Sequence, residues 1–246
     1  MNSISANLNI MIKAAEKASK ILIRDFGELE KLQVSSKGPL DFVTNSDKKV
    51  EKILIEELTK SRKKFSIISE EIGEVKNSDK DNYWIIDPID GTSNFLHGIP
   101  HFSISIALKS NKEIVSGLVF DPIKNEMFYG EKNNGAYFNN QRIRVSKKNN
   151  LDECLFGTNN NNIVKSSFNT RVMGSASLDL AYVGNERLDG FFQKNLKIWD
   201  IAAGIVIVKE AGGRINHIDY SEKENINLIA SSNNIHEKML EILINF

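Results

Sequence analysis

Two aspartates follow an apolar run in the middle of the chain. The run Trp84-Ile85-Ile86 predicts a buried strand, and Asp87 and Asp90 come where this strand is expected to end and the chain to turn. Carboxylates at a strand end can converge on a hard cation, because oxygen ligands suit the octahedral shell of Mg²⁺. Asp is also a common turn residue, so the two aspartates could instead do no more than stabilise a turn.

Gly91 and Thr92 directly follow the second aspartate. A glycine lets the backbone come close to a ligand, and the N–H groups of Gly91 and Thr92 would form an anion site if they open a short helix. Carboxylates that hold a metal beside an anion-binding turn are what phosphoryl chemistry requires. The pattern therefore favours a metal-dependent reaction on a phosphate.

Other acidic residues stand at the ends of predicted elements. Glu70 and Glu71 follow the apolar run 65–68, so either would lie at a strand end that could neighbour Asp87. Asp200 follows Trp199 at the start of a predicted buried helix, where it could be a site residue or only a cap. Paired acids repel one another unless a cation joins them.

The elements that must position these residues follow from periodicity and caps. Apolar residues at three- and four-residue steps predict helices over residues 5–24, 44–58, 175–183 and 199–211. Thr44 and Asp47 have the spacing of a capping box. Short β-favouring runs between residues 65 and 138 predict a mostly antiparallel sheet, and segment 31–44 is typical of a loop or hairpin that can close over a site.

Composition limits the class of protein. The chain has 246 residues, of which 41% are hydrophobic and 26% charged, as in ordinary folded proteins. Its 32 Lys and Arg offset 32 Asp and Glu, so there is no basic excess to draw it onto nucleic acid or anionic lipid. No apolar stretch approaches the roughly 20 residues that cross a bilayer, and the amino terminus lacks a signal-peptide core, which together indicate the cytoplasm and no membrane partner.

Four motifs in order resemble the inositol monophosphatase family. They are Asp41-Phe-Val-Thr-Asn-Ser-Asp47, Glu70-Glu71, Trp84-Ile-Ile-Asp-Pro-Ile-Asp-Gly-Thr92, and Trp199-Asp-Ile-Ala-Ala-Gly204 with Glu210-Ala-Gly-Gly213. The central motif is closer to the inositol monophosphatase branch than to the fructose-bisphosphatase or adenosine-bisphosphate phosphatase relatives. The resemblance covers most of the chain and implies an α/β (α+β) layered αβαβα sandwich of the inositol monophosphatase and fructose-1,6-bisphosphatase type.

The resemblance also implies a magnesium site of two or three ions. One ion would be bound by Glu70, Asp87 and the carbonyl of Ile89, and another by Asp87, Asp90 and Asp200. Glu70 and Thr92 would position the attacking water, while Asp47 would polarise the Thr92 hydroxyl. Small cations such as lithium would then inhibit.

The family pattern further supplies substrate contacts. Besides Asp90, the residues implied are Gly91, Thr92, Gly174, Ser175, Ala176, Gln193 and Lys37. Many relatives have Glu where this chain has Gln193, which weakens a transfer of inositol specificity. The segment 154–171 is also short beside that of relatives, which affects the neighbouring substrate wall and the subunit interface.

The expected activity is hydrolysis of a small phosphate monoester, with myo-inositol 1-phosphate as the leading substrate and a homodimer as the assembly. Rival substrates are histidinol phosphate, a nucleoside bisphosphate and a sugar phosphate. A different rival is a regulatory protein in a transcription or RNA complex, for which the basic cluster Arg142, Arg144, Lys147 and Lys148 could contact a partner. We expect two closely packed halves, residues 1–141 with the metal-binding strand ends and residues 142–246 with Asp200 and the substrate wall.

Overall fold

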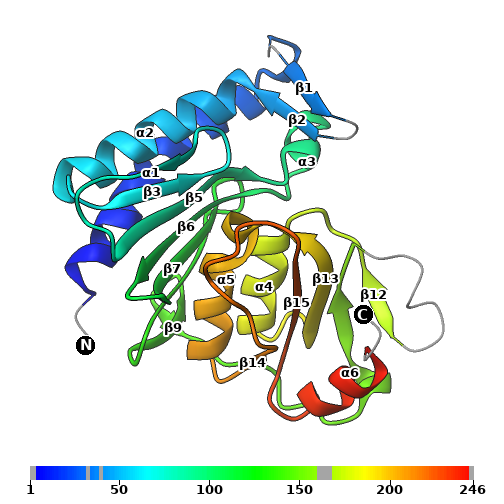
Figure 1. Ribbon diagram of the computed structural model, residues 1–246. Coiled ribbons are helices and arrows are strands. Elements are labelled where there is room, and N and C mark those ends of the chain that lie inside the picture. The colour runs from blue at the N-terminus through cyan, green and yellow to red at the C-terminus, as the bar shows by residue number, and fades with distance from the viewer. Residues whose placement is uncertain (1–3, 32–33, 39–40, 160–167, 244–246) are drawn as a thin grey trace.

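The computed structural model describes residues 4–31, 34–38, 41–159 and 168–243, without the side chains of residues 31–43. Layers of helices and sheets alternate through the molecule (Figure 1). In order they are α1 (Ala6–Phe26) with α2 (Asn45–Ser61), an eight-stranded sheet, α4 (Ala176–Gly184) with α5 (Ile198–Glu210), a five-stranded sheet, and α6 (His236–Ile242). This arrangement confirms the predicted αβαβα sandwich.

The larger sheet has the strand order β10-β9-β8-β7-β6-β5-β3-β4 and is antiparallel except where β3 runs parallel to β5. Its strands are β3 (Ser66–Ser69), β4 (Gly73–Val75), β5 (Asn82–Asp90), β6 (Ser103–Ser110), β7 (Glu113–Asp121), β8 (Glu126–Glu131), β9 (Gly135–Phe138) and β10 (Gln141–Arg142). The mostly antiparallel sheet predicted from the sequence is therefore present. One difference matters below, because β5 continues to Asp90 instead of ending at Asp87.

The smaller sheet has the order β12-β11-β13-β15-β14. Its strands are β11 (Leu155–Gly157), β12 (Asn169–Arg171), β13 (Gly190–Leu196), β14 (Arg214–Ile215) and β15 (Ile226–Ser231). The remaining elements are β1 (Val34–Gly38), β2 (Asp41–Thr44), α3 (Thr92–Leu96) and the 3₁₀ turns Leu29–Lys31 and Leu151–Glu153. Antiparallel pairing of β1 with β2 shows that the described residues 34–38 and 41–44 are the two strands of a hairpin, one of the two forms expected.

Strand β5 is buried on both faces, which explains its continuous apolar run. Trp84 and Ile86 pack in the core beneath α1 and α2, whereas Ile85 packs in the core around α4 and α5. These cores lie on opposite faces because successive side chains of a strand point to opposite sides. The carboxylates that follow are thereby held on a strand fixed from both sides.

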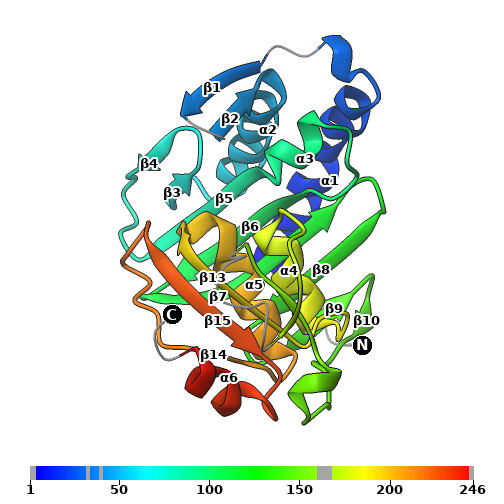
Figure 2. The ribbon, with the colours of Figure 1, turned by 90° about the vertical axis from the view of Figure 1, so that its right-hand side faces the viewer.

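Helix α5 is also enclosed, with β15 in front of it and the strands of the larger sheet behind it (Figure 2). Its approach to the larger sheet is close, since a Cβ on Gly117 of β7 would lie 2.5 Å from the carbonyl oxygen of Ala203. The almost wholly buried helix confirms the prediction from its all-round apolar sequence. No helix among the residues described is both long and apolar enough to cross a membrane.

Candidate active site

The parallel pairing of β3 with β5 places Glu70 beside Asp87. Ser69 pairs with Ile86, and the Glu70 N–H donates to the Ile86 carbonyl oxygen over 3.2 Å. Parallel strands end at the same edge of a sheet, so the residue after β3 lies next to the carboxylate of β5. Glu71 lies near α2, where burial and, to a smaller extent, the charge of Glu71 raise the pKa of Asp47 and of Glu51.

A bulge in β5 brings Asp87 and Asp90 together. Asp87 pairs with Ser105 and Asp90 pairs with Ser103, so three steps along β5 match two along β6. In a regular strand, residues three apart face opposite sides of the sheet. The extra residue at Pro88 and Ile89 reverses this alternation locally, and both carboxylates turn toward one side.

Helix α5 adds Asp200 from its first turn. The Asp200 Oδ2 accepts the Lys197 N–H over 2.8 Å, so the residue is a helix cap as one interpretation expected. Ser105, the pairing partner of Asp87, donates its hydroxyl to the Trp199 carbonyl over 3.3 Å. This contact fixes the start of α5 beside β5 and β6. Asp200 is therefore held next to Asp87 as well as closing the first turn of the helix.

Burial and neighbouring acidic charges raise the pKa of both Asp87 and Asp200. Burial, followed by the charges of Glu70, Asp90 and Asp200, raises the pKa of Asp87 well above its usual range. Burial and the charge of Asp90 raise the pKa of Asp200 to about 8. No three His, Cys, Asp or Glu side chains of the described chain are grouped so that they could hold a metal ion. The acids lie near enough for their charges to raise the pKa of Asp87 and of Asp200, but the side chains described are not arranged as a ligand set.

Asp90 is tied to the start of α4. Its Oδ2 accepts the Ser175 hydroxyl over 2.5 Å, the Ser177 hydroxyl over 2.5 Å and the Ser177 N–H over 2.7 Å. Burial raises the pKa of Asp90, and the hydrogen bonds from Ser175 and Ser177 oppose this rise. Ser175 is also the N-cap of α4, whereas its contact with substrate stays a prediction.

Asp47 lies next to Thr92, as the family pattern implies. The Thr92 hydroxyl lies 2.9 Å from the Ile89 carbonyl oxygen and 3.4 Å from the Asp47 Oδ1. The other Asp47 oxygen closes the predicted capping box, accepting the Thr44 N–H over 2.7 Å and the Thr44 hydroxyl over 2.5 Å. Burial raises the pKa of Asp47 to about 6.

The turn at Gly91 packs against the turn at Gly174. Gly91 has a φ of +97°, and a Cβ there would lie 3.2 Å from the Gly174 carbonyl oxygen. Asn94 joins the two segments, since its amide donates to the carbonyls of His101 and Met173, each over 2.8 Å. The segment Gly174-Ser175-Ala176 thus stands beside the predicted anion-binding turn.

Two predicted substrate contacts are not joined to this cluster by any described contact. Gln193 is partly buried on β13, paired in register with Leu228. Lys37 lies on β1, but its side chain is outside the described part of the structure. Residues 160–167 of the short segment 154–171 are also outside the described part. Their roles stay predictions.

Three buried polar residues of this region were missed by sequence reasoning. Ser177 binds Asp90, Glu51 binds the turn after Ser69, and Asp179 has an Oδ1 without a hydrogen-bond partner and a pKa raised by burial and by Asp90. Only Glu51 had a local signal, because it lies four residues after Asp47 and hence on the same helix face.

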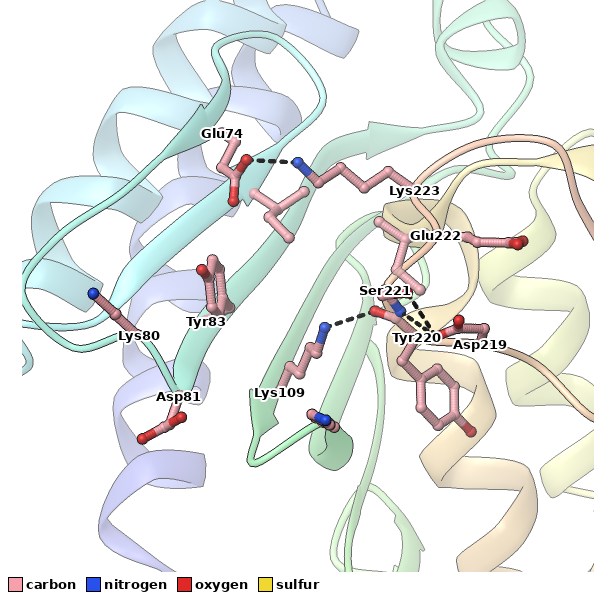
Figure 3. A pocket seen from close by; sticks show the side chains of 13 residues that line it. Glu74, Lys80, Asp81, Tyr83, Lys109, Asp219, Tyr220, Ser221, Glu222 and Lys223 are labelled. Atoms are coloured by element: carbon pink, nitrogen blue, oxygen red, sulfur yellow. Dashed lines mark hydrogen bonds and ion pairs between the residues drawn. The ribbon is translucent and has the colours of Figure 1, made fainter.

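A separate hollow of about 480 Å³ lies between β4, β5, β6 and the loop 219–223 (Figure 3). Four lysines and four acidic residues line it, so their charges balance and the hollow favours neither an anionic nor a cationic ligand. Lys223 pairs with Glu74 over 2.6 Å, and Lys109 donates to the Tyr220 carbonyl over 2.7 Å. Its lining includes none of the predicted site residues, and its contacts hold the loop against the larger sheet.

Comparison with known proteins identifies the family and the fold. The model of the inositol monophosphatase family matches residues 5–245. An inositol-1-monophosphatase of Rhizobium meliloti is 45% identical over 85% of this chain and 84% of its own. A protein named Nus factor SuhB from Pasteurella multocida is 41% identical over 85% of this chain and 84% of its own. The crystal structure of the extragenic suppressor protein suhB from Bartonella henselae has a TM-score of 0.92 at 43% identity, covering 97% of this chain and 98% of that one.

The family match and the convergence of four carboxylates on neighbouring element ends agree. Motifs, fold and relatives extend over nearly the whole chain. This chain belongs to the inositol monophosphatase family, whose members are phosphoric monoester hydrolases.

Proposed function

We propose that the protein hydrolyses a small phosphate monoester with magnesium, and that myo-inositol 1-phosphate is its leading substrate. The observation that carries the proposal is that acids from three elements meet: the β5 bulge turns Asp87 and Asp90 to one side, and Glu70 follows β3 beside Asp87. Asp200 begins α5 next to the same strand, and burial with the neighbouring charges raises the pKa of Asp87. Like charges gathered from β3, β5 and α5 are costly unless a cation joins them. A set of repelling buried acids therefore indicates that the protein binds a cation at this place.

The residues present fit magnesium. Their donors are carboxylate oxygens, to which the Ile89 carbonyl adds a neutral oxygen, and hard oxygen donors are those that Mg²⁺ prefers. Glu70, Asp87 and the Ile89 carbonyl would hold one ion, and Asp87, Asp90 and Asp200 another, with two or three ions in total. Bound magnesium would neutralise phosphate charge and activate the attacking water.

The chain's own groups would orient water and substrate. The Thr92 hydroxyl has one proton, and if Asp47 accepts it, the hydroxyl oxygen is left to accept a hydrogen bond from the water. Glu70 would hold the same water. The N–H groups of Gly91 and Thr92 would bind the phosphate, and Asp90, the 174–176 segment, Gln193 and Lys37 would contact the rest of the substrate.

A regulatory function is the second candidate, favoured by the relative named Nus factor SuhB. The basic cluster at residues 142–148 would be its contact surface. One of its charges is engaged, because Lys148 pairs with the buried Asp189 over 2.9 Å. A homodimer, lithium sensitivity and a cytoplasmic location remain our expectations for either function.

A panel assay tests the proposal. Inositol 1-phosphate, glycerol 2-phosphate, histidinol phosphate, a sugar phosphate and a nucleoside 3′,5′-bisphosphate are compared with Mg²⁺ and with a chelator. We expect magnesium-dependent release of phosphate, fastest from inositol 1-phosphate and reduced by lithium. Absence of magnesium-dependent turnover on every substrate would contradict the proposed activity. Preference for another substrate would correct only the choice of alcohol.

A further inference from the structure

Glu51 of α2 binds the turn that carries Glu70. Its side chain is buried, with 3% of the residue's surface exposed. The Oε1 atom accepts the Ser69 hydroxyl, the Glu71 N–H over 3.1 Å and the Ile72 N–H over 3.2 Å. These donors lie on both sides of Glu70 in the chain, so a single oxygen holds both flanks of that residue.

We propose that Glu51 is a positioning residue that aims Glu70 at Asp87. The inference rests on the proposed function, in which Glu70 binds metal and water. Asp47 lies one helical turn before Glu51, and residues four apart share a helix face. One face of α2 therefore presents two buried carboxylates, of which Asp47 meets Thr92 and Glu51 meets the Glu70 turn. The helix sets the distance between the two segments that supply the site.

Side-chain packing contributes little to holding the turn in place. A hollow of about 420 Å³ borders the turn and is lined by Glu51, Glu71 and Ile72 with residues of α2. Ile72 is 48% exposed, so it does not anchor the turn in a core. Hydrogen bonds to a carboxylate are roughly twice as strong as neutral ones. Glu51 therefore supplies side-chain hydrogen bonds that hold this turn, in addition to the backbone pairing of Ser69 with Gly73 and the bond from the Glu70 N–H to Ile86.

The first test measures the turn itself in metal-free protein. Hydrogen exchange of the peptide covering residues 69–72 is compared in wild type, Glu51→Gln and Glu51→Ala. We expect faster exchange at Glu71 and Ile72 in both variants, more in Glu51→Ala, because Glu51→Gln replaces the carboxylate by a weaker amide acceptor and Glu51→Ala removes the acceptor altogether. Glu56→Ala, on an exposed position of the same helix, is the matched control and should exchange like wild type. Unchanged exchange in Glu51→Gln and Glu51→Ala would overturn the inference.

The second test measures the metal. Residues that orient metal ligands typically change metal affinity or activity by about 10- to 100-fold when replaced. We expect Glu51→Ala to need about tenfold more Mg²⁺ for half-maximal activity, and to bind Mn²⁺ correspondingly less well by electron paramagnetic resonance. Glu51→Gln, which keeps an acceptor oxygen, should shift less and remains informative if Glu51→Ala does not fold. A lower Tm with wild-type metal dependence would show a merely structural role and overturn the inference.

A parallel variant separates this inference from the proposed function. Glu70→Gln removes the charge of the proposed ligand without removing Glu51. If Glu70→Gln leaves the Mg²⁺ dependence unchanged, the ligand assignment of Glu70 fails and the positioning inference fails with it. If Glu70→Gln raises the Mg²⁺ requirement while both Glu51 variants match wild type in metal dependence and exchange, only the positioning inference fails.

Discussion

At the scale of single residues, the two oxygens of Asp90 have different neighbours. Oδ2 accepts three hydrogen bonds from Ser175 and Ser177, so the proposed cation would be bound by Oδ1. An amide oxygen could accept the same three bonds, whereas its NH₂ group could not bind a cation. The proposed metal role and the structural role of Asp90 can therefore be separated by substitution.

We predict that Asp90→Asn loses turnover but keeps the fold, while Asp90→Ala also loses stability. Three donors without an acceptor should cost Asp90→Ala about 1–3 kcal/mol or more in free energy of unfolding. This corresponds to a Tm lower by at least about 2–4 °C for a chain of this size. Calorimetry and phosphate release check both variants. Near-normal activity in Asp90→Asn would remove Asp90 from the metal site.

Thr92→Val tests the hydroxyl that lies between Ile89 and Asp47. Val keeps the branched shape and the backbone N–H but cannot orient water. Because misplacing a reacting group can cost on the order of 10²-fold, we predict that kcat falls by about that factor while KM changes little. Steady-state kinetics at saturating Mg²⁺ give both constants. An unchanged kcat with a raised KM would instead make Thr92 a substrate-binding residue.

At the scale of elements, the site depends on two turns in contact. β5 ends in a bulge, Gly91 turns the chain in a left-handed conformation, and α3 begins directly afterwards. The turn before α4 packs on the same spot, 3.2 Å from where a Gly91 Cβ would lie. Glycine is required here by backbone conformation and by space together.

Gly91→Ala and Gly212→Ala separate these two requirements. Gly212 also has a positive φ, of +90°, but its Cβ would meet nothing within 4 Å. The left-handed conformation should cost each variant about 1–2 kcal/mol in free energy of unfolding. We predict that only Gly91→Ala also loses activity, because it pushes the 174 turn away from the site. Equal activity in the two variants would show that the contact between the turns is dispensable.

At the scale of the whole molecule, α5 brings an acid from the sequence-distant part of the chain to the edge of the larger sheet. Its first turn carries Asp200, whose pKa is raised to about 8 by burial and Asp90. A carboxyl whose folded-state pKa is raised holds its proton more tightly in the folded state. Its contribution to stability is therefore complete below the unfolded pKa near 4 and is lost as the pH rises toward 8.

We predict that metal-free Asp200→Asn gains stability relative to wild type between pH 5 and pH 8. At pH 5 the Asp200 carboxyl is protonated in the folded protein and resembles Asn. At pH 8 the wild-type carboxyl is either ionised among the other acids or protonated at a pH that favours its ionised form, and either state lowers the free energy of unfolding. The Asn oxygen can still accept the Lys197 N–H. Tm measured at both values, with chelator, gives the difference, and added Mg²⁺ should reverse it by stabilising wild type. A pH-independent difference would contradict the electrostatic convergence.

The sequence by itself determined the local structure and most site candidates. Periodicity and caps located α1, α2, α4 and α5, including the Thr44 and Asp47 capping box, because these signals lie within one or two helical turns. The ordered motifs identified Glu70, Asp87, Asp90 and Asp200 as a group through family resemblance. Division of the chain near residue 141 stays a prediction.

The tertiary structure decided how these residues meet and what holds them. The β5 bulge depends on register with β6, Ser177 reaches Asp90 across 87 positions, and Glu51 reaches Ser69 across 18. A serine or glutamate in an amphipathic helix has no local pattern that reveals such a partner. Its partner is set when α2 and α4 pack against the ends of β3 and β5, since burial then requires each polar group to find a hydrogen bond.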